Sequence, residues 1–146
     1  MNNAQKSIAG LFITALPLAY ACKSPEVVYP IPANHVVLER GKSIATSTGI
    51  IVFVDTVNIS ICPKQAACFA PDNLFASVRL VRNQESRAVR LFAWFGSESS
   101  DRSANRSDST SVQFNGQLYK VILKGEYVGE TDLSRVGRAL LQVSPL

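Results

Sequence analysis

The residues with the most obvious capacity for chemistry are three cysteines, Cys22, Cys62 and Cys68, and a single histidine, His35. A zinc site needs about four ligands, and five residues separate Cys62 from Cys68, so the sequence predicts neither a zinc site nor a Cys-x-x-Cys redox pair. His35 stands at the border between a proline-rich segment and the first predicted strand, where a surface position is expected rather than a catalytic one. We therefore expect no metal and no cofactor.

Asp55 is the one carboxylate singled out as a candidate for acid or base catalysis. It interrupts an otherwise apolar stretch, and the alternative interpretation is an outward-facing or capped aspartate. The sequence contains no Gly-x-Ser-x-Gly elbow, phosphate loop or His-Glu-x-x-His motif. These observations favour a protein that is not an enzyme.

Residues 1–21 have the organisation of a bacterial-type signal peptide. A short start carrying Lys6 precedes an apolar run over 8–18, and Ala19-Tyr20-Ala21 has the small-x-small pattern of a cleavage site. The run is shorter than the about 20 apolar residues that span a bilayer. Removal of Lys6 lowers the formal net charge from +4 to +3, a mildly basic balance that does not indicate nucleic-acid binding. We therefore predict export and no nucleic-acid partner.

Cys22 directly follows the cleavage pattern. The run Leu18-Ala19-Tyr20-Ala21-Cys22 resembles a bacterial lipoprotein box, in which the cysteine becomes the lipidated first residue of the mature protein. The resemblance implies a protein anchored to a membrane of the cell envelope through a lipid on Cys22. The alternative is cleavage by ordinary signal peptidase, which would give a soluble secreted protein.

The number of cysteines supports the lipid anchor and predicts one disulfide. Exported proteins work where disulfides persist, and an odd free thiol there needs an explanation. If Cys22 carries the lipid, Cys62 and Cys68 remain to form one bridge around Lys64. Such a small ring contributes on the order of 2 kcal/mol to stability by the loop-entropy relation.

The segment over 22–34 differs in pattern from the rest of the chain. It contains Pro25, Pro30 and Pro32 and little regular alternation, which predicts an extended tether. The folded domain is expected to occupy residues 35–146.

Alternation with a period of two dominates this domain and predicts about seven or eight short strands and no amphipathic helix. The stretch over 50–54 is apolar on both faces and is expected to be central in a sheet. A last strand over 138–143 should bury Ala139, Leu141 and Val143. The pattern implies an all-β fold, either a small antiparallel β-sandwich or a partly open barrel.

The first predicted hairpin joins strands over 75–82 and 87–95. Asn83–Ser86 is expected to form a four-residue loop between them. This register pairs Leu80 with Val89 and places Arg79 directly opposite Arg90. Like charges in that position destabilise a strand pair, so we expect the two arginines either to splay and share a carboxylate such as Glu85 or Glu98, or to bind a partner.

The second predicted hairpin turns at Asn115-Gly116, the preferred dipeptide of a type I′ turn, and pairs Val112 with Tyr119. Tyr119, Val121 and Leu123 should then face inward, while Lys120 and Lys124 face outward. Between the hairpins, the serine-rich stretch over 97–111 has little apolar surface to bury and is expected to form a loop.

The order of several motifs resembles a family of small, uncharacterised bacterial secreted proteins and lipoproteins. The motifs, which cover roughly residues 35–125, are Leu38-x-x-Gly41, a Gly49-led apolar strand, Cys62-Pro63-x4-Cys68, Val78-Arg79-Leu80 and Gly116-x-x-Tyr119-x-Val121-x-Leu123. The resemblance implies the all-β fold and the bridged loop. It implies no activity.

Two functions follow as expectations. The first is a non-catalytic interaction or structural module of the cell envelope, whose protein or anionic partner contacts a sheet face carrying Arg79, Arg90, Lys120 and Lys124. The second is a small secreted protease inhibitor that inserts the bridged loop around Lys64 into an enzyme cleft. Titration against serine proteases would separate them.

Overall fold

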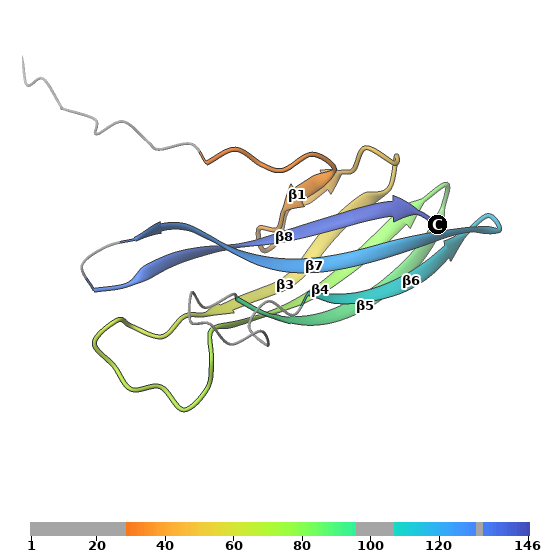
Figure 1. Cartoon of the computed structure of the whole chain (residues 1–146). Helices are drawn as coiled ribbons and strands as arrows, with labels where there is room; N and C mark the ends of the chain where they lie inside the picture. The colour runs from red at the N-terminus through yellow and green to blue at the C-terminus, as the bar shows by residue number, and fades with distance from the viewer. Residues whose placement is uncertain (1–28, 96–106, 131–132) are drawn as a thin grey trace, which may run out of the picture.

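The computed structural model describes residues 29–95, 107–130 and 133–146, which form two four-stranded antiparallel sheets packed into a β-sandwich (Figure 1). The predicted all-β sandwich is therefore confirmed, and the two sheets do not close into a barrel. The predicted signal peptide, the lipidation site Cys22 and most of the predicted tether lie outside the described residues.

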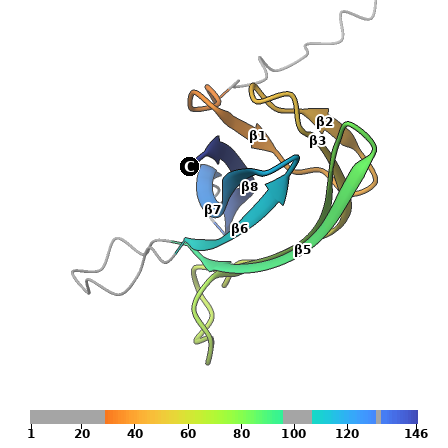
Figure 2. The same cartoon turned by 90° about the vertical axis from the view of Figure 1, so that its right-hand side faces the viewer.

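Each sheet combines one short edge strand with three longer strands. In the first sheet the order is β1 (His35–Val37), β8 (Arg135–Pro145), β7 (Gln117–Glu130) and β6 (Asp108–Phe114). In the second sheet the order is β2 (Ser43–Ala45), β3 (Ile51–Ser60), β4 (Asn73–Arg82) and β5 (Glu85–Trp94). The end-on view shows the two sheets curving around a common interior (Figure 2).

The core lies between the inner faces of the sheets and is built by alternation along each strand. Ala139, Leu141 and Val143 are buried as predicted, and so are the inward residues of β7. Because the inner faces meet, the largest fully buried side chains come from both sheets: Phe114, Ile50, Leu74, Leu80, Leu123 and Leu141. This shared core holds the two sheets together.

The β6–β7 hairpin has the predicted register. Val112 pairs with Tyr119, and both Asn115 and Gly116 have positive φ, at 48° and 81°, as a type I′ turn requires. The strand β6 begins at Asp108, so the end of the predicted loop over 97–111 was wrong. The residues over 108–111 form β6 because each pairs with a residue of β7.

The predicted register of the β4–β5 hairpin was wrong by two residues. Arg82 pairs with Glu85, so the loop is the two-residue turn Asn83-Gln84, and both of its residues have positive φ. Arg79 therefore faces Ala88 and does not face Arg90. A primed two-residue turn matches the twist of the strands. It also leaves more residues in the β4–β5 ladder than the predicted four-residue loop would. The sequence hid this turn because glutamine rarely adopts a left-handed conformation.

A β-bulge in β3 explains how this strand changes faces. The pairing with β4 shifts between Val54 and Thr56, so Asp55 is the extra residue. Val52 and Val54 are buried before the bulge, whereas Val57 packs against the core after it. β3 is an inner strand of its sheet as predicted, but only one of its faces is covered.

Candidate functional site

The predicted basic face is divided between two sheets. Arg79 and Arg90 lie on β4 and β5, whereas Lys120 and Lys124 lie on β7 in the other sheet. Each of these residues is exposed beside buried neighbours, so its side chain points away from the core. The arginines and the lysines therefore occupy opposite outer faces of the sandwich, and the prediction that one face carries all four was wrong.

The outer face of the sheet β2-β3-β4-β5 combines the two arginines with aromatic and aliphatic side chains. Phe53 pairs with Arg79 across β3 and β4, and Phe75 pairs with Phe92 across β4 and β5. Ile51 and Phe92 are each 42 % exposed. We call this surface the arginine–aromatic face; its residues are Ile51, Phe53, Phe75, Arg79, Val81, Arg90, Phe92 and Trp94.

Arg79 has partners within this face. Its guanidinium carbon lies 5.4 Å from the centre of the Phe53 ring, and a guanidinium nitrogen lies 3.6 Å from an oxygen of Asp55. Both charged side chains of this pair are about half exposed. Asp55, the predicted catalytic candidate, therefore occupies a surface bulge beside an arginine. Exposed pairs of this kind contribute about 0–1 kcal/mol, so Arg79 stays available to a ligand.

Arg90 has no ion pair within the described residues. It lies opposite Ser77, and its neighbours along the same face of β5 are Ala88 and Phe92. Glu85, one of the carboxylates expected to serve it, instead pairs with Arg87 at 3.0 Å and accepts a hydrogen bond from the backbone N–H of Asn115. The other, Glu98, lies outside the described residues.

Two aromatic rings lie next to Arg90 on the same strand. Phe92 and Trp94 meet edge to face, with ring centroids 4.8 Å apart. The edge of β5 beside them is capped, because the backbone N–H of Phe92 donates to the Asp108 carboxylate at 2.9 Å. This contact blocks pairing of another strand at that point and leaves the ring surface as the exposed feature.

The opposite outer face, on the sheet β1-β8-β7-β6, is partly covered. Arg138 donates to the backbone carbonyls of Tyr29 and Pro30, at 3.0 and 2.6 Å, and pairs with Glu126. The end of the predicted tether is therefore fastened to the domain. Leu140, which points to the same side as Arg138, is buried outside the main core cluster. Lys120 and Lys124 remain exposed on this face.

His35 has a local role in this region. It begins β1, pairs with Gln142 of β8, and its Nδ1 lies 2.9 Å from the carbonyl oxygen of Ala33. This contact stabilises the turn that leads into β1. It brings no carboxylate or nucleophile to the imidazole.

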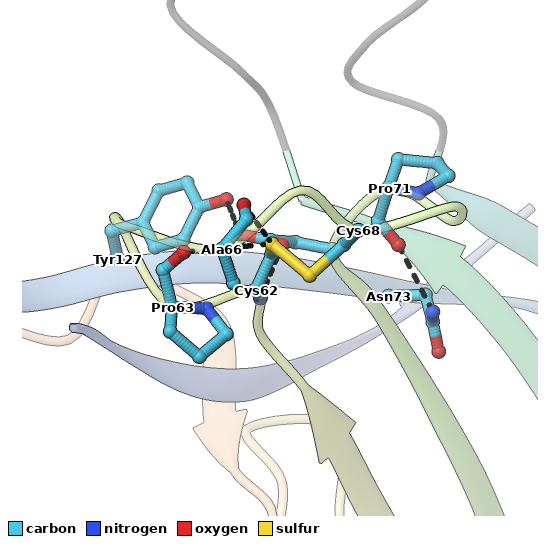
Figure 3. Close-up of a disulfide and its surroundings, with 8 residues drawn as sticks. Cys62, Pro63, Ala66, Cys68, Pro71, Asn73 and Tyr127 are labelled. Atoms are coloured by element: carbon cyan, nitrogen blue, oxygen red, sulfur yellow. Dashed lines mark hydrogen bonds between the residues drawn. A yellow bond between two sulfur atoms is a disulfide. The ribbon is translucent and has the colours of Figure 1, made fainter.

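The predicted disulfide between Cys62 and Cys68 is present (Figure 3). Its loop is docked on the β7–β8 hairpin, because the backbone N–H of Lys64 donates to the Leu133 carbonyl at 3.1 Å. The ammonium group of Lys64 also forms a salt bridge with Glu130. The hydrogen bond from the Lys64 side chain and its positive charge lower the pKa of the Glu130 carboxyl. Lys64 is thus engaged within the protein rather than extended from the loop.

A partly buried polar contact beside the disulfide was not predicted. Asp72 accepts hydrogen bonds from the backbone N–H of Cys62, at 2.7 Å, and from the Tyr127 hydroxyl, at 2.5 Å. Burial of the phenol, its hydrogen bond to Asp72 and the carboxylate charge raise the pKa of Tyr127 to about 12. The hydrogen bond and charge of Arg135 oppose this shift but are smaller, so Tyr127 acts as a protonated donor to Asp72.

Aromatic packing against glycine supports this region. The ring of Phe95 lies 5.1 Å from that of Tyr127, centre to centre. A Cβ added to Gly125 would come within 2.9 Å of Phe95, and one added to Gly137 would come within 2.6 Å. Only glycine at both positions leaves room for the ring. The sequence shows Gly125 and Gly137 within β-rich stretches. It does not show that both pack against Phe95.

A small open hollow lies on the outside of this region. It has a volume of about 240 Å³ and is lined by Tyr29, Tyr127, Val128, Gly129, Glu130 and Arg135. The guanidinium of Arg135 lies over the Tyr127 ring at 5.2 Å. No group of three metal-ligating side chains occurs among the described residues. The described residues that line the hollow therefore offer polar contacts.

The chain matches no protein-family model, no curated protein and no solved structure. The family resemblance drawn from the sequence therefore stays a prediction. Within the described part of the chain, no helix is long and apolar enough to cross a membrane.

Proposed function

We propose that this protein is a non-catalytic interaction module of the bacterial cell envelope. Residues 1–21 direct its export, a lipid on Cys22 anchors it, and the arginine–aromatic face binds a partner that carries negative charge. The observation that carries this proposal is the exposure of two arginines among aromatic rings on the outer face of β3, β4 and β5.

The composition of this face supports binding. The outer face of an antiparallel sheet that only meets water is expected to be polar. Here the outward positions of β3 and β5 include Ile51, Phe53 and Phe92, each between 36 and 42 % exposed. Contiguous exposed apolar surface marks interaction sites, and arginine and aromatic residues dominate the energetics of such sites.

The charges of this face support an anionic partner. Arg90 has no ion pair among the described residues, and Arg79 has only a half-exposed pair with Asp55. An arginine guanidinium binds carboxylate, phosphate or sulfate groups through two parallel hydrogen bonds. A partner with such groups would gain two sites of charge-assisted bonding beside rings that provide apolar contact.

The proposed face is tested by charge reversal with a matched control. We expect Arg79→Glu with Arg90→Glu to abolish retention of the mature domain on a heparin column and on acidic lipid vesicles. Lys120→Glu with Lys124→Glu makes the same change in net charge on the opposite face and should only reduce retention. Circular dichroism and urea unfolding would check that both variants fold. Equal loss in the two variants, or retention by the arginine variant, would exclude the arginine–aromatic face.

The proposed anchor is tested separately. We expect the native protein to partition into the detergent phase, and Cys22→Ser to move it to the aqueous phase. Native protein found entirely in the aqueous phase would refute lipidation and would leave the proposed binding face untouched.

The protease-inhibitor alternative has less support from the geometry. An inhibitory loop must present a side chain that can enter a cleft. The Lys64 ammonium group is instead paired with Glu130, and the backbone N–H of Lys64 donates to the Leu133 carbonyl. We therefore do not propose inhibition as a second function.

A further inference from the structure

Two apolar side chains stand exposed at one end of the sandwich. Phe69, in the loop that follows the disulfide, is fully exposed, and Leu133, before β8, is 64 % exposed. The hydrogen bond from Lys64 to Leu133 joins their two loops. Figure 1 shows the loop between β3 and β4 and the β7–β8 connection at the same end of the molecule. We call Phe69 and Leu133 the apolar tip.

The described N-terminal segment starts near this end. A turn at Ala33–Asn34, where Asn34 has a φ of 62°, reverses the chain before β1. Tyr29 consequently lies beside Arg138, and its side chain lines the hollow next to Glu130 near the end of β7. The first described residue is therefore at the end of the sandwich that carries the apolar tip.

The length of chain before Tyr29 limits the distance to the anchor. Six residues lie between Cys22 and Tyr29, so the two are seven residue steps apart along the chain. A fully extended chain of that length spans at most about 25 Å. If Cys22 carries a lipid, as the proposed function requires, Tyr29 lies within that distance of the bilayer, and the end of the sandwich with the apolar tip is the end that is tethered to the membrane.

We propose that the apolar tip contacts the lipid surface and orients the domain. Among the described residues at this end, Lys64 pairs with Glu130, Arg138 pairs with Glu126, and the Arg135 guanidinium lies over the Tyr127 ring. This end therefore offers apolar contact without a strong preference for anionic lipid. An apolar side chain that enters the interface gains burial that it lacks in water. The strands then point away from the bilayer, and the arginine–aromatic face remains open to a partner.

The experiment uses the lipidated full chain in phosphatidylcholine vesicles. Trp94, the only tryptophan, is replaced by phenylalanine, and Phe69→Trp then introduces a reporter at the apolar tip. The matched control is Leu118→Trp, since Leu118 is also exposed, at 46 %, but follows the β6–β7 turn. We expect the emission of the Phe69→Trp protein to shift to shorter wavelength and to be quenched by nitroxide lipids. The Leu118→Trp protein should show neither effect.

The outcomes separate this inference from the anchor on which it rests. Protein that floats with the vesicles while the Phe69→Trp emission stays unshifted would overturn the lipid contact and retain the anchor. Protein that does not float would overturn both. Equal shifts at both positions would overturn the proposed orientation.

Discussion

The two ends of the sandwich are built in different ways. At one end, β4–β5 and β6–β7 are joined by two-residue turns, and their ladders continue to the last pair before each turn. At the other, the end with the apolar tip, twelve residues separate β3 from β4, and this connection is held by the disulfide, by Asp72 and by the bond from the Lys64 backbone to Leu133. We call these the turn end and the loop end.

The difference shows where side chains must replace the ladder. A tight turn keeps the backbone groups of both strands paired. A long connection leaves backbone donors that need other partners and costs entropy to order. At the loop end, Asp72 meets this need, because its carboxylate accepts from a backbone N–H and from a distant tyrosine.

The largest expected effect at the loop end concerns glycine packing. A Cβ on residue 137 would lie 2.6 Å from both Ile61 and Phe95, so Gly137→Ala should lower the free energy of unfolding by about 2–3 kcal/mol. The matched control is Gly129→Ala in the same hairpin, where the nearest atoms would be at 3.7 and 3.8 Å and the change should stay below about 0.5 kcal/mol. Urea unfolding measures both. Equal effects in the two variants would show that the packing of Phe95 does not require glycine at residue 137.

The next effect concerns the disulfide. Replacing Cys62 and Cys68 together by serine should lower the free energy of unfolding by about 2 kcal/mol, because the unfolded chain loses a constraint. Hydrogen exchange should become faster at the Lys64 amide and remain unchanged at the turn end. A variant with unaltered stability and a protected Lys64 amide would mean that docking on the β7–β8 hairpin holds the loop without the bridge.

A third prediction examines the turn end, where the sequence is not optimal. Gln84 adopts a φ of 69°, which is costly for a residue with a side chain. Gln84→Gly creates the Asn-Gly dipeptide already present at 115–116 and should raise the free energy of unfolding by about 1 kcal/mol. The midpoint of urea unfolding measures the change. A destabilised variant would instead support the four-residue loop expected from the sequence.

The smallest expected effect depends on pH. Because the pKa of Tyr127 is raised to about 12, its contribution to stability is complete below pH 10 and is lost as the pH rises from about 10 to 12. Tyr127→Phe should cost less than about 1 kcal/mol at pH 7, and this difference from the native protein should shrink above pH 10. Urea unfolding of both proteins at pH 7 and at a pH above 10 measures this difference. A difference that is constant with pH would show that the phenol does not titrate with folding.

The sequence predicted much of the fold because alternation decides which side chains face inward. Val78, Leu80, Val89 and Leu91 are buried as the pattern indicated, although the register between their strands was wrong by two residues. A shift of two residues preserves the alternation, and therefore the core survives the error. The predicted pairing of Arg79 with Arg90 was wrong, because direct cross-strand pairs depend on the register itself.

The sequence alone determined the number of strands approximately, the inward residues of β7 and β8, the Asn115-Gly116 turn and the pairing of the cysteines, since these depend on neighbours close in the chain. Only the tertiary structure decided which strands share a sheet. That choice separated Arg79 and Arg90 from Lys120 and Lys124, and it brought Asp72 to Tyr127 across 55 residues. These outcomes depend on packing between distant segments, for which a single sequence carries no local pattern.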